Sequence, residues 1–491
     1  MIKLNRNLVP DTVNTSPDYY CTWQTQLYAS NDGGPQGQRD ILNENALFGR
    51  SFPNGWTDFY PDARRDLLFV MDDSWDVPYG EGPFDSKWYG SLILDAEKFP
   101  SFAGEKTENK IALKAINEAV KQKGWRGLGG WICAQTAPAF KGADREEYWK
   151  ARLLEADFSG WSYWKIDWGE DSRDIKFRKM INTLKKQFAP KLIAEQAMIT
   201  ELVPSSDVYR TYDVPAIMSI PMTMEKLAEV LVFDAESDCL ALIDCEDEVY
   251  IAAALGCSMG VMRHPMAGPL PDGRPDPSFP DLHRNLKTKL DEVTRAVRWH
   301  RLAPAFAVNG SSTVISDEIL TDTWQVEDQP REIEAWWKFK NGDVIEKRAP
   351  AAIVRGLPLP AVVPDSNGDI PFITAAKNPN GAVSIATLGR TVGRSFKTPK
   401  CELVLDTEDA AVFGIFGEYK SLTLKTAKAI SKSHILAQDL LDNASYDITD
   451  NIIIGNGFIT VSGELIYKIG TMCAHSGDTS EPGLIIKIEN Y

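Results

Sequence analysis

The feature that most constrains the fold is a regular alternation of short apolar runs and helix-patterned segments across residues 20–305. One helical segment carries Leu113, Ile116 and Val120 and stops at Gly124, the spacing of a helix with one buried stripe. The apolar runs predict eight strands, at residues 20–28, 67–72, 128–134, 163–167, 192–196, 208–212, 241–245 and 260–263, with further helices at 177–190 and 281–300. Eight strands separated by helices predict an α/β fold of the (β/α)8 TIM-barrel type. A doubly wound open sheet is the alternative, but no GxGxxG motif follows the first strand.

After about Pro304 the pattern becomes that of an all-β domain. Asn341-Gly342 separates the runs 336–340 and 343–346, which indicates a hairpin. Alternating runs predict further strands at residues 383–388, 401–405, 421–424, 452–454, 458–461 and 484–488. The proline-rich stretch 350–371 is typical of a loop or an edge strand. We therefore expect a barrel over residues 1–305 and a C-terminal antiparallel β-sandwich over residues 306–491.

Charge and cysteine content restrict the partners and the compartment. The formal net charge of −16 argues against nucleic acid and anionic membranes, which attract basic surfaces, and is compatible with a neutral ligand. The seven cysteines are scattered and form no CxxC pair, so neither a zinc site nor a disulfide framework is indicated. The first 20 residues lack an apolar core of signal-peptide length, so we expect a cytoplasmic protein. The oligomeric state stays open, a homo-oligomer included.

The stretch SYWKIDWGED, residues 162–171, places Lys165 and Asp167 one residue apart at the end of the fourth predicted strand. Side chains at positions i and i+2 leave a strand on the same face. A charged pair on a buried face is costly unless it is used or fully paired, so this pair marks a candidate site.

Other acidic residues gather at the same edge of the predicted barrel, where the active sites of such barrels lie. Each strand end from the second to the seventh, except the third, carries at least one acid. The candidate site residues are Trp23, Asp72, Asp73, Trp75, Trp131, Lys165, Asp167, Glu195, Arg210 and Asp213, with Trp168 beside them. Paired carboxylates that flank one bond, acids that bind hydroxyl groups and aromatic faces that stack on a ring favour cleavage of a glycosidic bond.

The surroundings of the two central acids suggest different roles. Lys165 would hold Asp167 ionised, which suits a nucleophile, whereas Asp213 lies two strands further on with fewer cations nearby and suits the acid/base. Arg210 would hold sugar hydroxyls or orient a carboxylate. Glu195 would bind the sugar or pair with Lys165.

Five stretches in chain order resemble the retaining α-galactosidases of glycoside hydrolase families 27 and 36, in the arrangement typical of family 27. They are MDDSWDVP, LDAEKFPS, GLGGWICA, YWKIDWG and YRTYDV, and the resemblance covers about residues 20–305. It implies a (β/α)8 barrel followed by an antiparallel β domain and an α-galactosidase-like activity without a cofactor. It also implies that Asp167 is the nucleophile, that Asp213 is the acid/base, and that the sugar is held by Asp72, Asp73, Lys165 and Arg210.

The chain departs from the family pattern at three positions. Trp168-Gly169 stands where the family usually has a cysteine. The spacing from Arg210 to Asp213 is one residue shorter than usual, and the segment that reads the sugar O2 in the family appears as Glu195-Gln196. The reaction type therefore transfers better than the identity of the sugar.

Other interpretations remain open at this stage. Asp72-Asp73 could cap a helix, Lys165 and Asp167 could form a structural ion pair, and Asp213 could begin a turn. The acids of CEDEVYIAAAL are typical of a helix start, and His264 of a hydrogen-bonded structural histidine. At the level of function, Lys165 could be the nucleophile of a Schiff-base aldolase, or the barrel could bind sugar without cleaving it. The acids could also hold calcium, but no EF-type loop is present, and we expect no metal and no cofactor.

Overall fold

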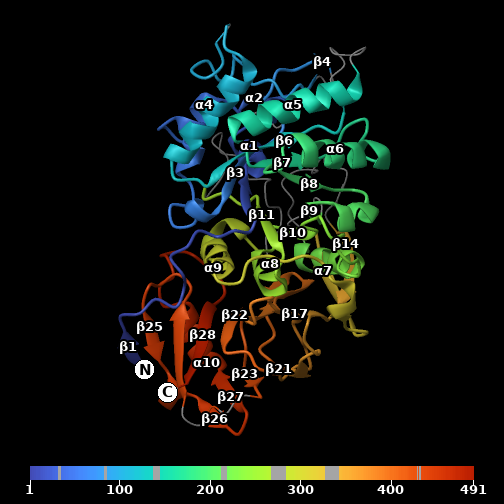
Figure 1. Cartoon of the computed structure of the whole chain (residues 1–491). Helices are drawn as coiled ribbons and strands as arrows, with labels where there is room; N and C mark the ends of the chain where they lie inside the picture. Colours follow the sequence, from blue (N-terminus) through green and yellow to red (C-terminus); the bar gives the residue numbers. More distant parts are fainter. Residues whose placement is uncertain are drawn as a thin grey trace.

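The structure is a computed structural model that describes residues 1–30, 35–81, 86–104, 106–135, 144–211, 218–266, 284–326, 342–427, 430 and 433–490. Figure 1 shows two parts, a helix-rich half that contains the barrel and a sheet-rich half that contains both chain termini.

Eight parallel strands close into a barrel, in the order in which they occur along the chain, because the last strand pairs with the first. The strands are β2 (Tyr19–Cys21), β3 (Leu68–Met71), β6 (Gly127–Ile132), β7 (Tyr163–Ile166), β8 (Ile193–Gln196), β9 (Val208–Arg210), β10 (Leu242–Glu246) and β11 (Ser258–Val261). The predicted (β/α)8 barrel is thus confirmed, with seven strands within a few residues of their expected positions. The first differs: the strand ends at Cys21 and the chain turns at once into helix α1 (Trp23–Ala29).

Helices cover the outside of the barrel. They are α4 (Asn109–Gln122), α5 (Arg145–Ser159), α6 (Ile175–Phe188), α7 (Ser219–Val230), α8 (Val249–Leu255) and α9 (Leu290–His300), with α2 (Pro35–Asp40) and α3 (Glu44–Phe48) in the long connection between β2 and β3. Helix α4 buries Leu113, Ile116 and Val120, the stripe that predicted it. Asp144 and Asp174 cap the first turns of α5 and α6 through their side-chain oxygens. Short 3-10 turns lie at Trp56–Asp58, Arg64–Asp66, Thr200–Ser205, Leu286–Thr288, Gly310–Ser312 and Thr449–Asn451, and a two-stranded ribbon joins β4 (Gly80–Glu81) to β5 (Lys87–Trp88).

The barrel interior is filled by side chains that alternate along each strand. Tyr19, Leu68, Val70, Tyr163 and Val208 belong to one buried cluster inside the ring. Gly260 faces this cluster, and a Cβ at that position would lie 2.5 Å from the hydroxyl oxygen of Tyr19. Only glycine leaves room for that tyrosine, so the barrel is a packed core below a functional rim.

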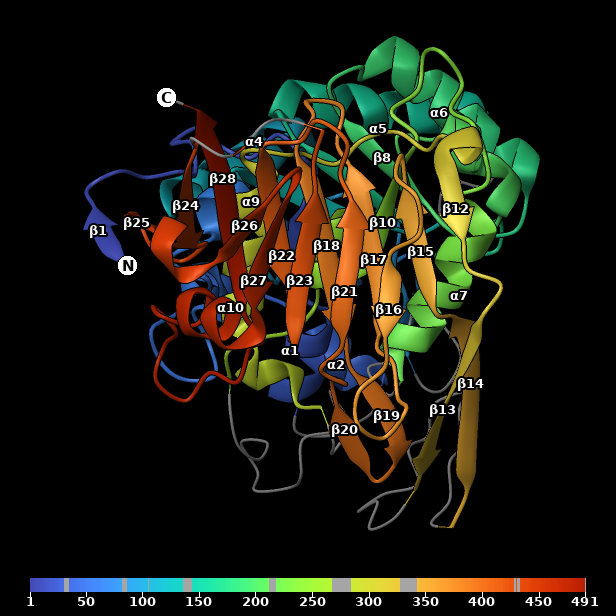
Figure 2. The ribbon, with the colours of Figure 1, turned by 90° about the horizontal axis from the view of Figure 1, so that it is seen from below.

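The described residues of the C-terminal domain form three sheets, as expected of a β domain (Figure 2). The largest has nine strands in the order β1 (Ile2–Leu4), β25 (Ser445–Asp447), β24 (Ser433–Asp439), β28 (Gly483–Asn490), β22 (Val412–Phe416), β18 (Val383–Leu388), β17 (Phe372–Lys377), β15 (Ala352–Arg355) and β12 (Thr313–Ile315). A five-stranded sheet contains β16 (Ala361–Val363), β21 (Glu402–Asp406), β23 (Ser421–Lys425), β27 (Phe458–Ser462) and β26 (Ile453–Gly455), and a four-stranded sheet contains β14 (Val344–Pro350), β13 (Ile319–Gln325), β19 (Arg390–Gly393) and β20 (Ser395–Lys397). One further helix, α10 (Gly463–Gly470), follows β27.

Several details of this domain differ from the sequence predictions. Most strand pairs are antiparallel, but β13–β19, β15–β17, β18–β22 and β21–β23 are parallel. Within the proline-rich stretch, β16 is the expected edge strand, whereas β15 lies inside the nine-stranded sheet and is fully buried. The expected hairpin strand at 336–340 lies outside the described residues, and β14 pairs with β13. The N-terminal β1 pairs with β25, so the expected barrel domain 1–305 differs in this respect, because its first residues join the C-terminal sheet.

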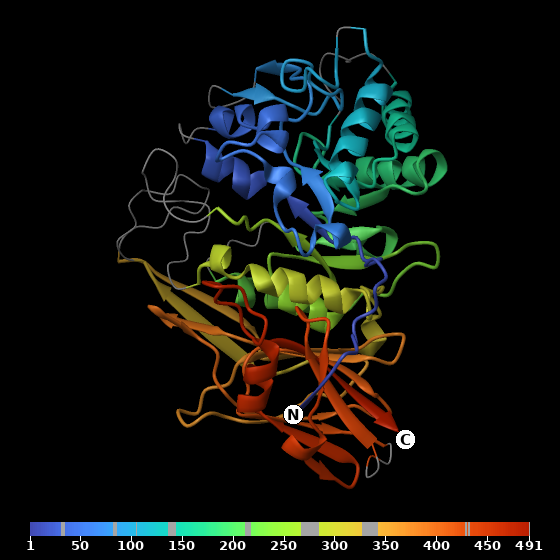
Figure 3. The same cartoon turned by 90° about the vertical axis from the view of Figure 1, so that its left-hand side faces the viewer.

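The two halves share a continuous core. Helices α8 and α9 lie between the barrel strands and the nine-stranded sheet (Figures 1 and 3). Trp299 of α9 packs on β22, where a Cβ at Gly414 would lie 2.8 Å from the indole ring, and Tyr250 of α8 lies 4.9 Å from Phe416 between ring centres. Because apolar burial joins both halves, we expect them to unfold together.

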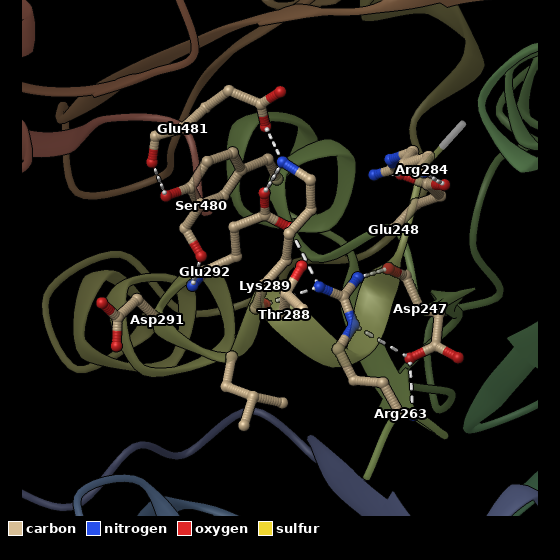
Figure 4. A network of polar contacts seen from close by, with 12 residues as sticks. Asp247, Glu248, Arg263, Arg284, Thr288, Lys289, Asp291, Glu292, Ser480 and Glu481 are labelled. Atoms are coloured by element: carbon tan, nitrogen blue, oxygen red, sulfur yellow. Dashed lines mark hydrogen bonds and ion pairs between the residues drawn. The ribbon is translucent and has the colours of Figure 1, made fainter. Parts of the chain in front are cut away.

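Polar contacts also tie the C-terminal domain to the barrel (Figure 4). One oxygen of Asp478 accepts hydrogen bonds from the backbone N–H groups of Leu290 (2.8 Å) and Asp291 (3.1 Å), so a residue of the β domain caps α9. Lys289 lies 3.6 Å from Glu292 and 3.4 Å from Glu481, across the boundary between the two halves.

Among the described residues, no helix is both long and apolar enough to span a bilayer.

Candidate functional site

The candidate site is built on the carboxyl ends of the barrel strands. Tyr163, Lys165 and Asp167 occupy alternate positions at β7, and strand periodicity turns all three toward the barrel axis. Lys165 is in register with Trp131 on β6 and with Glu195 on β8. The strand pairing therefore brings these side chains to one level of the barrel without help from the loops.

Two buried cations organise the carboxylates of the site. Lys165 Nζ lies 2.9 Å from Asp72 and 3.9 Å from Glu246. Arg210 lies 2.8 Å from Asp167, 2.9 Å from Glu195 and 3.4 Å from Glu246. Glu246 bridges the two cations, so the charges form one connected network in which each cation contacts at least two carboxylates.

Asp167 is the carboxylate of this network that keeps most exposure. It remains 8% exposed, whereas Glu195 and Arg210 are at 0%. Its Oδ1 accepts a hydrogen bond from Arg210 (2.8 Å) and its Oδ2 accepts one from the indole N–H of Trp131 (2.9 Å). Burial raises the pKa of Asp167, but the charges of Arg210 and Lys165 and these hydrogen bonds outweigh burial, so the pKa lies below its usual value. The carboxylate is thus ionised and fixed in orientation.

Lys165 was expected to pair directly with Asp167, but in the structure it pairs with a different carboxylate. Its ammonium group is bound by Asp72, whose Oδ2 also accepts a hydrogen bond from the thiol of Cys21 (2.9 Å). Burial lowers the pKa of Lys165, but the neighbouring charges, Asp72 first, raise it well above the ordinary lysine value. A lysine that stays protonated is a poor amine nucleophile, which argues against a Schiff-base aldolase.

Glu195 lies beneath the rim and its role has to be corrected. Its Oε2 accepts hydrogen bonds from the hydroxyl groups of Tyr163 (2.6 Å) and Tyr19 (3.1 Å), and its Oε1 pairs with Arg210. With no exposed surface, it orients Arg210 instead of contacting a sugar or pairing with Lys165. Burial and the charge of Glu195 raise the pKa of the neighbouring Asp244 well above its usual value, which favours its neutral form.

The tryptophans divide into structural and site-facing residues. Trp75 was expected to bind substrate but is 1% exposed, donates its N–H to the carbonyl of Trp131 (2.9 Å) and packs on Trp161, so it is a core residue. Trp23 begins α1 and is half-buried against the barrel interior. Trp168 is half-buried, with its ring centre 6.2 Å from that of Trp131. Trp131 and Trp168 form an aromatic wall beside Asp167, in which Trp131 is only 2% exposed and Trp168 has the surface left to contact a ligand.

Asp73 belongs to a neighbouring contact set on the same rim. Its Oδ2 pairs with Arg39 Nε at 2.8 Å, and its Oδ1 is buried without a hydrogen-bond partner among the described residues. Burial raises the pKa of Asp73 to about 6, although the charge of Arg39 opposes this. Asp72-Asp73 precede a strained turn and not a helix, because Ser74 adopts a φ of +87°.

One expected catalytic residue stays untested. Asp213 lies outside the described residues, so its distance to Asp167 is not known. His264, which was expected to be structural, is fully buried with its ring 4.9 Å from that of Tyr28.

Sequence reasoning missed several members of the site. Glu246 is the last residue of β10, not part of a helix start. Tyr163 could have been found from its position two residues before Lys165 on the same strand face, and Tyr19 from the equivalent position before Cys21. Arg39 could not, since it lies on a short helix with no pattern that points to the rim.

One group of side chains with metal-ligand spacing lies elsewhere. Glu236, Asp238 and Cys239 come together at the surface. Lys186 Nζ already donates to Asp238 (2.8 Å) and to the sulfur of Cys239 (3.2 Å), so a cation occupies this group.

No protein-family model and no curated protein sequence matches this chain. Similar solved structures include α-galactosidase I from Mortierella vinacea (11% identity, 97% of each chain, TM-score 0.42) and a family 27 β-L-arabinopyranosidase from Geobacillus stearothermophilus bound to arabinose (10% identity, 97% of each chain, TM-score 0.41). A third is a putative α-N-acetylgalactosaminidase from Bacillus halodurans C-125 (9% identity, 100% of each chain, TM-score 0.41). At this similarity the fold rests on the strand pairing of this chain, and the function on its site.

Proposed function

We propose that this protein is a retaining exo-α-glycosidase that hydrolyses terminal α-galactosyl or galactose-like residues. What carries the proposal is the state of Asp167: an ionised, oriented and partly exposed carboxylate at the carboxyl end of a barrel strand, flanked by an aromatic wall. The motif order of the sequence supports the choice of an α-galactosyl-like sugar. The reaction as proposed needs no cofactor.

The reaction proceeds by two displacements. A carboxylate oxygen of Asp167 attacks the anomeric carbon and forms a glycosyl ester while the bond to the leaving oxygen breaks. Asp213, assigned from the sequence, donates the proton that this oxygen needs. Asp213 then removes a proton from water, the water oxygen attacks the anomeric carbon, and Asp167 leaves as a carboxylate, so that the configuration of the sugar is retained.

The residues around Asp167 act by stabilising its negative charge and by fixing its orientation. Arg210 and the N–H of Trp131 each occupy one of its oxygens, which keeps it ionised before attack. Asp72 and Lys165 form an ion pair at the same level, and we infer that they bind sugar hydroxyls. A cytoplasmic location remains a prediction from the sequence of the first 20 residues.

A panel of aryl α- and β-glycosides, with the anomer of the released sugar read by NMR, tests the reaction class. We expect α-galactosides to be cleaved and the first product to be the α anomer. The β anomer as first product would contradict retention. Sugar binding without turnover on the whole panel would instead favour the non-catalytic barrel.

The D167N variant tests the nucleophile. We expect kcat to fall by about 10³-fold or more, because the variant lacks the carboxylate that the proposed mechanism uses as its nucleophile. The matched control is E170Q, whose side chain is exposed three residues further along the chain. For the acid/base, the D213A variant should be rescued by azide to give an α-glycosyl azide. Full residual activity of either variant would remove that residue from its role.

A further inference from the structure

Arg39 links helix α2 to the turn that carries Asp73. Its guanidinium Nε lies 2.8 Å from Asp73 Oδ2, and the arginine is only 8% exposed. Its backbone carbonyl accepts hydrogen bonds from Ser74 Oγ (2.6 Å) and Lys98 Nζ (2.8 Å). One residue of α2 therefore holds both Asp73 and Ser74, one through its side chain and the other through its backbone.

The turn that Arg39 holds is strained. Ser74 has a φ of +87°, a conformation that costs of order 1–3 kcal/mol for a residue with a side chain. Lys98 Nζ closes the contact set by donating to the carbonyl of Ser74 at 2.7 Å, and Gln26 donates to the carbonyl of Asp73 at 3.2 Å. Such strain persists where surrounding contacts over-determine the backbone. Here four groups of the turn are held: the carboxylate and carbonyl of Asp73, and the hydroxyl and carbonyl of Ser74.

Asp73 has one oxygen that this arrangement leaves for another partner. Oδ2 is taken by Arg39, while Oδ1 is buried without a hydrogen-bond partner among the described residues. Leaving a buried acceptor without a partner costs of order 1–3 kcal/mol. A ligand hydroxyl that donates to Oδ1 would recover this cost.

We propose that Arg39 is a positioning residue for the glycosidase reaction: it fixes the carboxylate of Asp73, ionised and with Oδ1 not bound by any described residue, so that Asp73 accepts a hydrogen bond from a substrate hydroxyl. The inference rests on the proposed function, since it takes Asp73 to contact the sugar. Arg39 itself touches no reacting atom and acts through Asp73.

The surroundings of Asp73 give this role a measurable signature. The titratable groups that face it are Asp72 and Asp76 from its own loop, Arg39 from α2, Lys98 from the loop before α4, Cys133 just after β6, and Tyr79 and Tyr89, which flank the ribbon of β4 and β5. Burial raises the pKa of Asp73 to about 6, and Arg39 is the cation that opposes burial most. Removing the guanidinium charge therefore moves this pKa further up, and Asp73 becomes protonated at neutral pH.

The experiment compares wild type with R39Q, R39K and the control R65Q, an exposed arginine that pairs with Asp11. For R39Q we expect kcat/KM to fall by about 10- to 100-fold at neutral pH, and the acidic limb of its pH profile to move up by about 1–3 units. R39K keeps the positive charge but places it differently relative to Asp73, so we expect its acidic limb to lie between those of wild type and R39Q. R65Q keeps the wild-type profile.

The outcomes separate this inference from the proposed function. If wild type cleaves α-glycosides and both Arg39 variants keep the wild-type acidic limb, the positioning role is overturned, even if their activity is lower. If R39Q does not fold, a wild-type limb for R39K overturns it. If wild type cleaves nothing, the proposed function fails, and the stability of R39Q then tests the electrostatic coupling between Arg39 and Asp73. A loss of stability, relative to wild type, that grows from pH 5 to pH 8 supports the coupling. A loss that is constant over this range contradicts it.

Discussion

A proton held between two carboxyl groups at the domain boundary gives the stability of this protein a defined pH dependence. Glu481, just before β28, faces Glu292 of α9, with Lys289 3.4 Å from the first and 3.6 Å from the second (Figure 4). Arg263 lies 2.9 Å from Glu292. The charges of Lys289 and Arg263 outweigh burial and lower the pKa of Glu292 to about 2, whereas burial and the negative charge of Glu292 raise the pKa of Glu481 to about 7.

The magnitude follows from the difference between the folded and unfolded states. The pKa of Glu481 is about 7 when folded and 4.5 as an ordinary glutamate. A group with a raised pKa stabilises the fold fully below its unfolded value, and this stabilisation is lost as the pH rises through the folded value. One pKa unit corresponds to about 1.4 kcal/mol. Part of the titration of the unfolded state lies below pH 5, so the loss between pH 5 and pH 8 is about 2.5 kcal/mol and not the full value of the shift.

The E481Q variant isolates this effect because glutamine stays neutral at every pH. We expect the free energy of unfolding of E481Q, relative to wild type, to rise by about 2.5 kcal/mol from pH 5 to pH 8. Urea unfolding followed by tryptophan fluorescence and circular dichroism at each pH measures it, and the shared core of the two halves favours a single transition.

The control, Glu489, lies on β28, the strand that follows Glu481. Glu489 pairs with Arg6 and Lys487 near the surface, and the hydrogen bond from Lys487 lowers its pKa. Its stabilisation is present above the unfolded pKa and lost only as the pH falls through the folded one, so E489Q should show an almost constant difference from pH 5 to pH 8. A constant difference for E481Q as well would refute the reasoning that Glu481 carries a proton at neutral pH.

Two other predictions concern buried contacts. Replacing Arg210 by Met should destabilise the protein by about 3–5 kcal/mol in urea unfolding, because it leaves several carboxylates without their cation. It should also move the acidic limb of the pH–activity profile to higher pH, because the pKa of Asp167 rises. Unchanged stability and an unchanged limb would contradict this. Adding a Cβ at Gly414 should lower stability by about 1–3 kcal/mol, because Trp299 lies within 2.8 Å of it. Gly80→Ala, at a glycine with open space around it, should leave the urea midpoint unchanged.

Hydrophobic periodicity was sufficient to predict the barrel because the strands are its most regular elements. The runs that predicted β7 and β8 end within one residue of the observed strands. The same regularity predicted that Lys165 and Asp167 share a face. Once strands pair in parallel and close, each strand end is at the same rim, so the acids that follow them come together by geometry.

The missed parts depend on contacts that no local pattern encodes. The first strand was predicted to run on to Tyr28, but the chain bends at Thr22, whose hydroxyl donates to Gln26 Oε1 and accepts from the N–H of Asp72. The pairing of β1 with β25 joins residues more than 440 positions apart. The cation that holds Asp167 was expected to be its sequence neighbour Lys165 and proved to be Arg210, since only the register of the barrel decides which side chains meet.

Arg210 explains how one cation can serve two carboxylates of different function. Its Nε pairs with Glu195 below the rim, where both oxygens of that glutamate are occupied and no surface is exposed. Its Nη2 pairs with Asp167 at the rim, where part of the carboxylate remains exposed. The buried pair fixes the guanidinium plane, because a planar fork bound on one edge has little freedom on the other. The orientation of Asp167 is therefore set from inside the barrel, and a substrate that reaches the rim meets a carboxylate that needs no rearrangement before it reacts.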